Sequence, residues 1–148
     1  MSNTTYLQPP NILNAPNIFG VCMAISSVGT AIDIVPGVLA TGIAVLAQAL
    51  IIRQVTPLGS ALDAPNDGID VRTLIKAGMT QAQVSQIPGT IRNQLLRDQR
   101  VKACTVDAVF DQVHGILTLT ESISSAAGPF TLTLQVSQVT VTAILNSQ

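Results

Sequence analysis

GIAVLAQALIIRQVTPLGSAL, residues 42–62, is the stretch that decides how this chain folds, because it completes an apolar run that either lipid or protein must cover. The run extends from Ile34 to Ile52 without a charged side chain. Pro36 suits the first turn of a helix. Apolar residues then recur at helical spacing, at Leu39, Ile43, Leu46 and Leu50. The sequence therefore predicts a helix that begins near Pro36 and is apolar on nearly all sides.

Burial in protein explains this helix better than a membrane span does. The uncharged window barely reaches the ~20 residues that a spanning helix needs, and Pro36 and Gly37 occupy its start. Gln48 lies well inside the window, and only Arg53 follows it, without a belt of Trp or Tyr. We therefore expect no membrane span, and we expect the helix to be covered by the rest of the fold and by partner subunits.

The composition points to a part of a larger assembly. The 148 residues fit one domain; 47% of them are hydrophobic and only 10% are charged, against about 25% charged in a typical soluble domain. A surface so poor in charge is expected where other subunits cover it. The net charge of −1 argues against direct binding of nucleic acid, which requires a basic excess.

Positive charge does gather in one short segment, at Arg92, Arg97, Arg100 and Lys102. A solvated helix face explains this cluster, and a docking patch for an acidic partner is the alternative. The two cysteines, Cys22 and Cys104, have no metal-ligand spacing, so we expect reduced, buried thiols and a reducing assembly compartment.

Two regions are predicted from the distribution of polar residues. Residues 1–18 are polar and rich in proline and asparagine, which predicts an extended N-terminal arm, and they lack the pattern of a signal peptide. Residues 19–148 are predicted to form a single α+β domain. Its first part, residues 19–35, is predicted to form one or two short strands, of which TAIDIV at 30–35 is the better candidate.

The remaining elements follow from turn signals and from a change of period. VRTLIKAG at 71–78 predicts a short helix that ends at Gly78, and Thr80 is a plausible N-cap for the next helix. Pro88-Gly89 predicts a kink or a break in that helix. From Val101 onward apolar and polar residues alternate, which predicts an antiparallel β-meander, with a bulge or short break near Ser137. The fold class is thus α+β, with two to three helices.

No constellation of residues supports catalysis or metal binding. Glu121 is the only glutamate, and it is predicted near a strand end. The Asp-rich loop at 63–70 is explained by turn chemistry, and as an EF-hand it fails at Pro65 and at Leu74. His114 is predicted in an exposed turn. We therefore expect no enzymatic activity, no cofactor and no metal.

One long stretch, LAQALIIRQVTPLGSALDAPNDGIDVRTLIKAG at 46–78, carries a family resemblance. A helix ends in Arg53, a Thr-Pro-x-Gly-Ser turn follows at 56–60, and an Asp/Pro/Gly loop leads to a short helix. After a second helix, LLRDQRVKACTV at 95–106 enters the meander. The order and spacing resemble the phage tail sheath-initiator family, the small baseplate-wedge proteins of contractile injection machines, often labelled lysozyme-like. The resemblance covers about residues 32–145.

The resemblance implies a compact α+β fold and a structural role in the tail baseplate of the virion, after assembly in the host cytoplasm. Several copies in a ring link the wedge core to the first sheath ring and template sheath assembly, with wedge proteins, the sheath protein and possibly the tail tube as partners. Many members have Glu-Pro-Arg where this chain has Asp98-Gln99-Arg100, so Gln99 replaces the rigid proline. The implied partner-binding residues are Arg97, Asp98, Gln99 and Arg100. The implied structural turn consists of Thr56, Pro57, Gly59, Ser60, Asp67 and Gly68.

Two other functions are consistent with the sequence. An adaptor or tail-completion protein of a non-contractile tail can use the same fold. A muralytic enzyme fits less well, because glycoside hydrolysis needs two suitably placed carboxyl groups and this chain has one glutamate.

Overall fold

The computed structural model describes residues 18–26, 33–75 and 79–147. It has the α+β fold that the sequence predicts, with a C-terminal antiparallel meander. The elements in chain order are β1 (Val21–Ser26), β2 (Asp33–Thr41), α1 (Ile43–Val55), the 3-10 helix η1 (Val71–Leu74), α2 (Gln81–Leu95), β3 (Val101–Asp111), β4 (Ile116–Ser125), β5 (Gly128–Val136) and β6 (Val141–Ser147). Residues 1–17 of the predicted arm lie outside the described residues.

The meander forms a four-stranded sheet in the order β3-β4-β5-β6, and all neighbouring strands are antiparallel. Alternation divides its side chains between two faces. One face is buried and apolar, and its fully buried members include Leu117, Leu119, Leu132, Leu134 and Val136. The other face carries many Thr and Ser side chains, such as Thr118, Thr120, Ser122 and Thr131. The predicted shared face of β3 is confirmed: Cys104 is buried, and Val106, Ala108 and Phe110 pack against the core.

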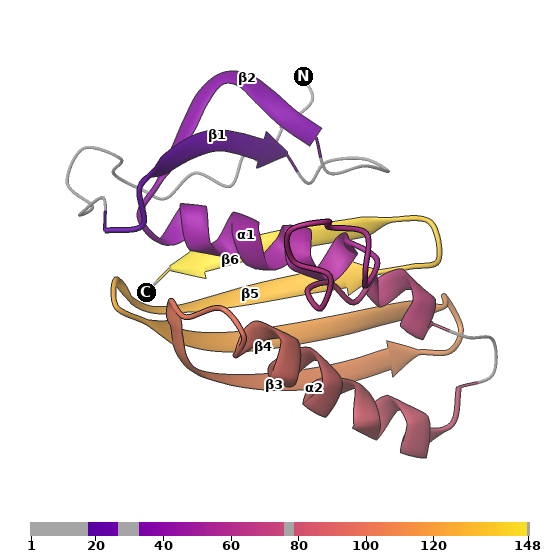
Figure 1. Ribbon diagram of the computed structural model, residues 1–148. Coiled ribbons are helices and arrows are strands. Elements are labelled where there is room, and N and C mark those ends of the chain that lie inside the picture. Colours follow the sequence, from indigo (N-terminus) through magenta and orange to yellow (C-terminus); the bar gives the residue numbers. More distant parts are fainter. Residues whose placement is uncertain (1–17, 27–32, 76–78, 148) are drawn as a thin grey trace.

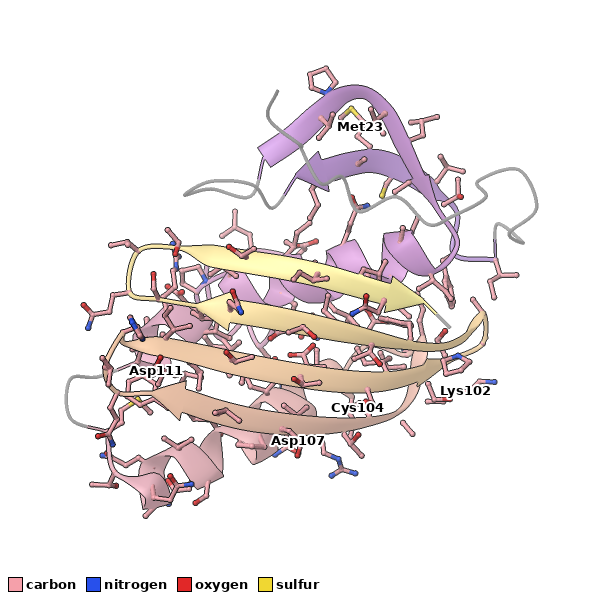
Figure 2. All side chains as sticks on the ribbon, turned by 180° about the vertical axis from the view of Figure 1, so that it is seen from behind. Met23, Lys102, Cys104, Asp107 and Asp111 are labelled. Carbon is pink, nitrogen blue, oxygen red and sulfur yellow. The ribbon has the colours of Figure 1, made fainter. Side chains whose placement is uncertain are left out.

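Both helices lie on the apolar face of this sheet (Figure 1). α2 runs along β3, and α1 lies over β5 and β6, with the two-stranded sheet of β1 and β2 on its other side. The view from behind shows no helix among the described residues over the opposite, polar face (Figure 2). Around α1 the molecule therefore has three layers, the two-stranded sheet, the helix and the four-stranded sheet.

Its position between two sheets explains why α1 is apolar all round. Eight of its residues are buried, among them Gln48, which the sequence places in an otherwise apolar run. The Gln48 side chain accepts a hydrogen bond from the backbone N–H of Ile25, and its Nε2 lies 3.1 Å from Cys22 Sγ. Gln48 thus ties the helix to β1. None of the helices in the described ranges is long and apolar enough to cross a membrane.

The predicted start of the first helix is wrong. Pro36 and Leu39 belong to β2, and α1 begins at Ile43. Leu39 pairs with Met23 of β1 and is 55% exposed, so it is not part of the helical stripe. Gly37 and Gly42 have φ values of 78° and 57°, which a helix does not allow. Hydrogen bonds to β1 satisfy backbone groups of residues 33–41, so this segment forms a strand. The helical spacing of its apolar residues gives no sign of this pairing.

The helix around Pro88 is not broken. α2 runs without interruption from Gln81 to Leu95, so of the two predicted alternatives, a kink or a break, the break is wrong. Thr80 is the N-cap, as predicted, and forms a capping box with Gln83. The apolar residues Val84, Ile87, Ile91 and Leu95 are buried against the core on both sides of the proline. Their burial holds the helix together across the single backbone N–H that proline lacks.

The short helix predicted from Val71 is present as the 3-10 helix η1, and its expected end at Gly78 lies outside the described residues. The change of period near Ser137 is a break, with a turn that reverses the chain before β6, because Ser137 N–H donates to the carbonyl of Thr140. Val139 is 73% exposed in this turn.

Candidate functional site

The Thr-Pro-x-Gly-Ser turn ends α1 and starts a loop that folds back on it. Thr56 is the C-cap, and its N–H and Oγ1 both donate to the carbonyl of Ile52, at 3.0 and 2.6 Å. The Pro57 carbonyl accepts from the N–H and the Oγ of Ser60, at 3.1 and 2.7 Å. Gly59, with φ of 82°, supplies the positive φ inside this turn. The predicted structural turn is therefore a local hydrogen-bonded unit.

Gly68 lets the loop close against its own beginning. The Asp70 N–H donates to the Thr56 carbonyl at 3.1 Å, which brings residue 68 directly against that peptide. A Cβ at Gly68 would lie 2.5 Å from the Thr56 oxygen and 3.1 Å from the Pro57 oxygen, and its φ is 110°. Both the close approach and the backbone angle require glycine here. Residues 56–70 thus form a closed loop at the end of α1.

Arg72 fastens the end of this loop. Its Nε and Nη2 donate to the two carboxylate oxygens of Asp70, at 2.8 and 3.3 Å, and Nη2 lies 3.5 Å from the Val55 carbonyl at the end of α1. The hydrogen bond to Asp70 raises the pKa of Arg72 further. Asp70 itself has φ of 43°, the one positive value at a non-glycine position in the described residues. The cation thus lies at the negative end of the α1 dipole.

Asp67 joins the closed loop to the turn after α2. Its Oδ2 lies 2.9 Å from Arg53 Nη2, at the end of α1, and its Oδ1 lies 3.3 Å from Arg97 Nε. Arg53 also donates from Nη1 to the Gln94 carbonyl in the last turn of α2, at 3.4 Å. One carboxylate therefore connects two segments that are far apart in the sequence, the one predicted as a structural turn and the one predicted to bind a partner.

The Asp98-Gln99-Arg100 turn is organised by its own carboxylate. Arg100 Nε and Nη2 donate to the two oxygens of Asp98 at 2.9 and 2.7 Å, and the Arg100 N–H donates to Oδ1 at 3.0 Å. The Asp98 carbonyl accepts from the Val101 N–H at 2.9 Å, where β3 begins. These bonds from Arg100 hold the pKa of the Asp98 carboxyl below its usual range, against the effect of burial. Gln99 is exposed between them.

These five charged residues form one group, which we call the arginine–aspartate cluster: Arg53, Asp67, Arg97, Asp98 and Arg100. Its two halves interact, because Arg53 also lowers the pKa of Asp98. Asp98 and Arg53 are the least exposed side chains of the cluster, at 8% and 15%, while Asp67 is 32% exposed. Arg97 and Arg100 are 47% and 34% exposed, so the cluster presents two arginine side chains at the surface. This arrangement suits recognition of an acceptor better than proton transfer, since each acid is ion-paired with arginine.

The other candidates for chemistry lie elsewhere. His114 is in the β3–β4 hairpin, as predicted, and its Nδ1 lies 2.6 Å from Asp111 Oδ2 on an exposed turn. This contact lowers the pKa of Asp111. Cys22 and Cys104 are free thiols, and burial raises the pKa of Cys104. No group of three or more His, Cys, Asp or Glu side chains is placed to hold a metal ion in the part of the chain that the structure describes.

Glu121 lies at the centre of β4 rather than near a strand end, and its side chain is fully buried between the sheet and α1. Oε2 accepts a hydrogen bond from Gln54 Nε2 at 3.0 Å. Burial raises the pKa of Glu121 to about 8. Sequence reasoning missed this pair, although its signal is visible: Glu121 occupies an inward position in the alternating run Leu117, Leu119, Glu121, Ile123.

Comparison of this chain with protein-family models gives no match, and comparison with curated proteins gives no significant match.

Proposed function

We propose that this protein is a structural subunit of a contractile phage tail baseplate or a related injection machine. In this role it links the wedge core to the first sheath ring. The observation that carries the proposal is the position of Asp67, which ties the Thr-Pro-x-Gly-Ser loop to the turn around Asp98. The two segments on which the sequence resemblance rests thus belong to one surface rather than to two unrelated turns.

The exposed arginines supply the contact in this proposal. Arg97 keeps half of its side chain at the surface while Asp67 fixes one edge of its guanidinium. A guanidinium held in this way is preorganised for a carboxylate or carbonyl of a partner, because less rotamer freedom is lost on binding. Gln99 lies exposed next to it and can contribute both a donor and an acceptor. We expect the wedge core to bind here.

Sheath templating requires a second surface. Addition of a partner strand to a sheet edge is the mode that we propose. The edges of the four-stranded sheet are β3 and β6. Arg92 of α2 donates to the Cys104 carbonyl on β3 at 3.2 Å, so one backbone acceptor of that strand is already occupied. Both strands of the two-stranded sheet are edges as well.

The proposal is tested by co-expression of this chain with the wedge and sheath proteins of its own particle, followed by purification through a tag on the wedge. We expect a stable complex. Arg97→Ala is expected to weaken that complex by about 2–5 kcal/mol, the usual cost of truncating one partner of a buried interfacial charge pair. The control is Asp107→Asn, a charged residue exposed on β3 that takes no part in the ion pairs of the arginine–aspartate cluster (Figure 2). Equal binding by both variants would contradict the assigned surface.

Electron cryo-microscopy of the intact particle provides the direct test. The proposal expects this chain in a ring around the tube, between the wedge and the first sheath layer. Density for the chain in a sheathless tail tip or at the neck would instead favour the adaptor function of a non-contractile tail. A cell-wall digestion assay on the purified chain addresses the muralytic alternative, and lytic activity that is lost in Asp67→Asn would overturn the structural proposal.

A further inference from the structure

The buried pair formed by Gln54 and Glu121 carries an inference that does not depend on the proposed function. Glu121 is 0% exposed, and so is Gln54, the last buried residue of α1. Only one hydrogen bond joins them, from Gln54 Nε2 to Glu121 Oε2 at 3.0 Å. Within the described residues, the remaining oxygens, Oε1 of Gln54 and Oε1 of Glu121, are both buried and have no hydrogen-bond partner.

Counting donors and acceptors identifies what is missing. An ionised Glu121 supplies acceptors only, so two buried oxygens stay unpaired, which is costly in an apolar core. A neutral carboxyl group adds one O–H donor. That donor can bond to the amide oxygen while the amide N–H bonds to the carboxyl oxygen, and the two planar groups then satisfy each other. Protonation thus removes both unpaired oxygens with a single hydrogen atom.

Among the residues that the structure describes, no cation acts on Glu121. Its cross-strand neighbours are Val106 of β3 and Leu132 of β5, both apolar. The nearby titratable group is the Cys104 thiol of β3, whose pKa burial raises and Glu121 raises further. From α2, Arg92 acts on Cys104, and from α1, Arg53 is engaged by Asp67. Burial accordingly raises the pKa of Glu121 to about 8, and the hydrogen bond from Gln54 only partly opposes it.

We propose that Glu121 is held in the core as a neutral carboxylic acid that forms a reciprocal pair with the Gln54 amide, and that this pair fastens the end of α1 to the centre of the sheet. Gln54 is adjacent to Arg53, which holds the closed loop through Asp67. Loss of the proton leaves a buried carboxylate beside an unpaired amide oxygen. The end of α1 then loosens, and the arginine–aspartate cluster loses its fixed position. The Gln54–Glu121 pair therefore fixes the position of the arginine–aspartate cluster only while Glu121 is protonated.

The presence of a single glutamate makes the test direct. The full chain is labelled with ¹³C in glutamate only, and the one side-chain carboxyl resonance is followed by NMR from pH 4 to pH 9.5, about the range that brackets the usual and the raised pKa. We expect the resonance of a neutral acid through neutral pH and a midpoint near the raised pKa of about 8. A midpoint near that of an exposed glutamate, about 4.3, would overturn the proposal.

Two further readouts test the pair and its effect. The side-chain amide signals of Gln54 are expected to shift with the same midpoint as the carboxyl group; if they do not respond, no reciprocal pair exists. The backbone amide signals of Gly68 and Asp70 are expected to shift with that midpoint as well. If these backbone amide signals stay constant across the titration, the loop does not respond to ionisation of Glu121, and the proposed effect of the pair on the loop is wrong.

The matched variant is Glu121→Gln, which keeps the shape and a donor but cannot ionise. The denaturation midpoint of the unmodified chain is expected to fall as the pH rises from about 4.5 to about 8. The pKa of Glu121 is higher in the folded chain than in the unfolded chain, so the neutral acid stabilises the fold fully below the unfolded-state pKa. This stabilisation is lost as the pH rises through the folded-state pKa. The variant is expected to lack this component. Identical pH profiles would contradict the proposal, and the NMR titration of the unmodified chain decides the question if the variant does not fold.

Discussion

Among single residues, Gly68 and Asp98 contribute most to the geometry of the site. Gly68 has both a φ of 110° and a neighbouring backbone oxygen where a Cβ would lie. The Asp98 carboxylate accepts three hydrogen bonds from Arg100, and these bonds determine the shape of the turn. Both residues were singled out from the sequence, Gly68 as part of a structural turn and Asp98 for partner binding. In the structure Asp98 and Arg100 form an ion pair with each other. Contact of these residues with a partner stays a prediction.

Gly68→Ala is expected to destabilise the fold more than Gly59→Ala does. Both variants place a side chain at a positive φ, which costs about 1–2 kcal/mol. Only at Gly68 does the new Cβ meet backbone atoms at 2.5 Å, whereas at Gly59 the nearest atom lies 3.9 Å away. We expect a total loss of about 3 kcal/mol or more at Gly68, since strain and displacement of the loop add to each other. Urea denaturation of both variants provides the comparison; equal losses would contradict the packing of the loop.

Asp98→Asn is expected to lower the free energy of unfolding at neutral pH by about 1.5–3 kcal/mol, the usual value of hydrogen bonds to a charged group. The folded-state pKa of Asp98 is lowered, so its stabilisation is present above the unfolded pKa of about 3.9 and is lost as the pH falls through the folded value. The difference between the unmodified chain and the variant should therefore shrink below about pH 4. If the difference in the free energy of unfolding is constant with pH, the hydrogen bonds from Arg100 do not depend on the charge of Asp98, and the prediction is wrong.

Among the secondary-structure elements, α1 and α2 differ in what determines their first and last residues. α2 begins with a capping box that the sequence announces at Thr80, and it continues through Pro88 because its apolar face is buried on both sides. α1 begins at Ile43, and its N-cap residue Gly42 provides no side-chain cap, so its limits come from the strand before it and from Thr56 after it. Packing overrides the local signal in both cases.

Thr80→Ala is expected to destabilise the fold by about 1 kcal/mol, because it removes the acceptor for the Gln83 N–H at the first turn of α2. Thr90→Ala is the matched control, since Thr90 lies exposed within the same helix and its hydroxyl donates only to the Gln86 carbonyl. We expect a change of less than about 0.5 kcal/mol for this control, or a slight gain. Thermal denaturation of the two variants measures the difference.

At the scale of the whole molecule, the two-stranded sheet leaves apolar side chains at the surface. Met23 and Leu39 are cross-strand partners that are 54% and 55% exposed, and Val21 and Ile34 are exposed to a similar degree. A scattered exposed residue needs no explanation, but these four lie on one small sheet. In a chain with only 10% charged residues, this surface agrees with the proposal of a subunit inside an assembly.

The double substitution Met23→Ser and Leu39→Ser is expected to leave the isolated chain nearly as stable, within about 1 kcal/mol, because exposed positions contribute little to folding. Its incorporation into the wedge complex or particle is expected to fall, since apolar contact area with a partner is lost. Val113→Ser in the exposed β3–β4 hairpin is the control. Normal incorporation of the double variant would show that partners do not cover this sheet.

Local patterns are enough to predict the α+β class, the C-terminal meander, the capped helix at Thr80 and the turn that ends α1, because period-two alternation, capping and glycine turns are local effects. The start of α1 depends instead on a tertiary contact, since the pairing of β2 with β1 outweighs helical spacing around Pro36. The same holds for the bridge from Asp67 to Arg97 and for the burial of Glu121 against Gln54. These contacts join distant segments, and their energies depend on burial and on the position of the partner, which no local pattern contains.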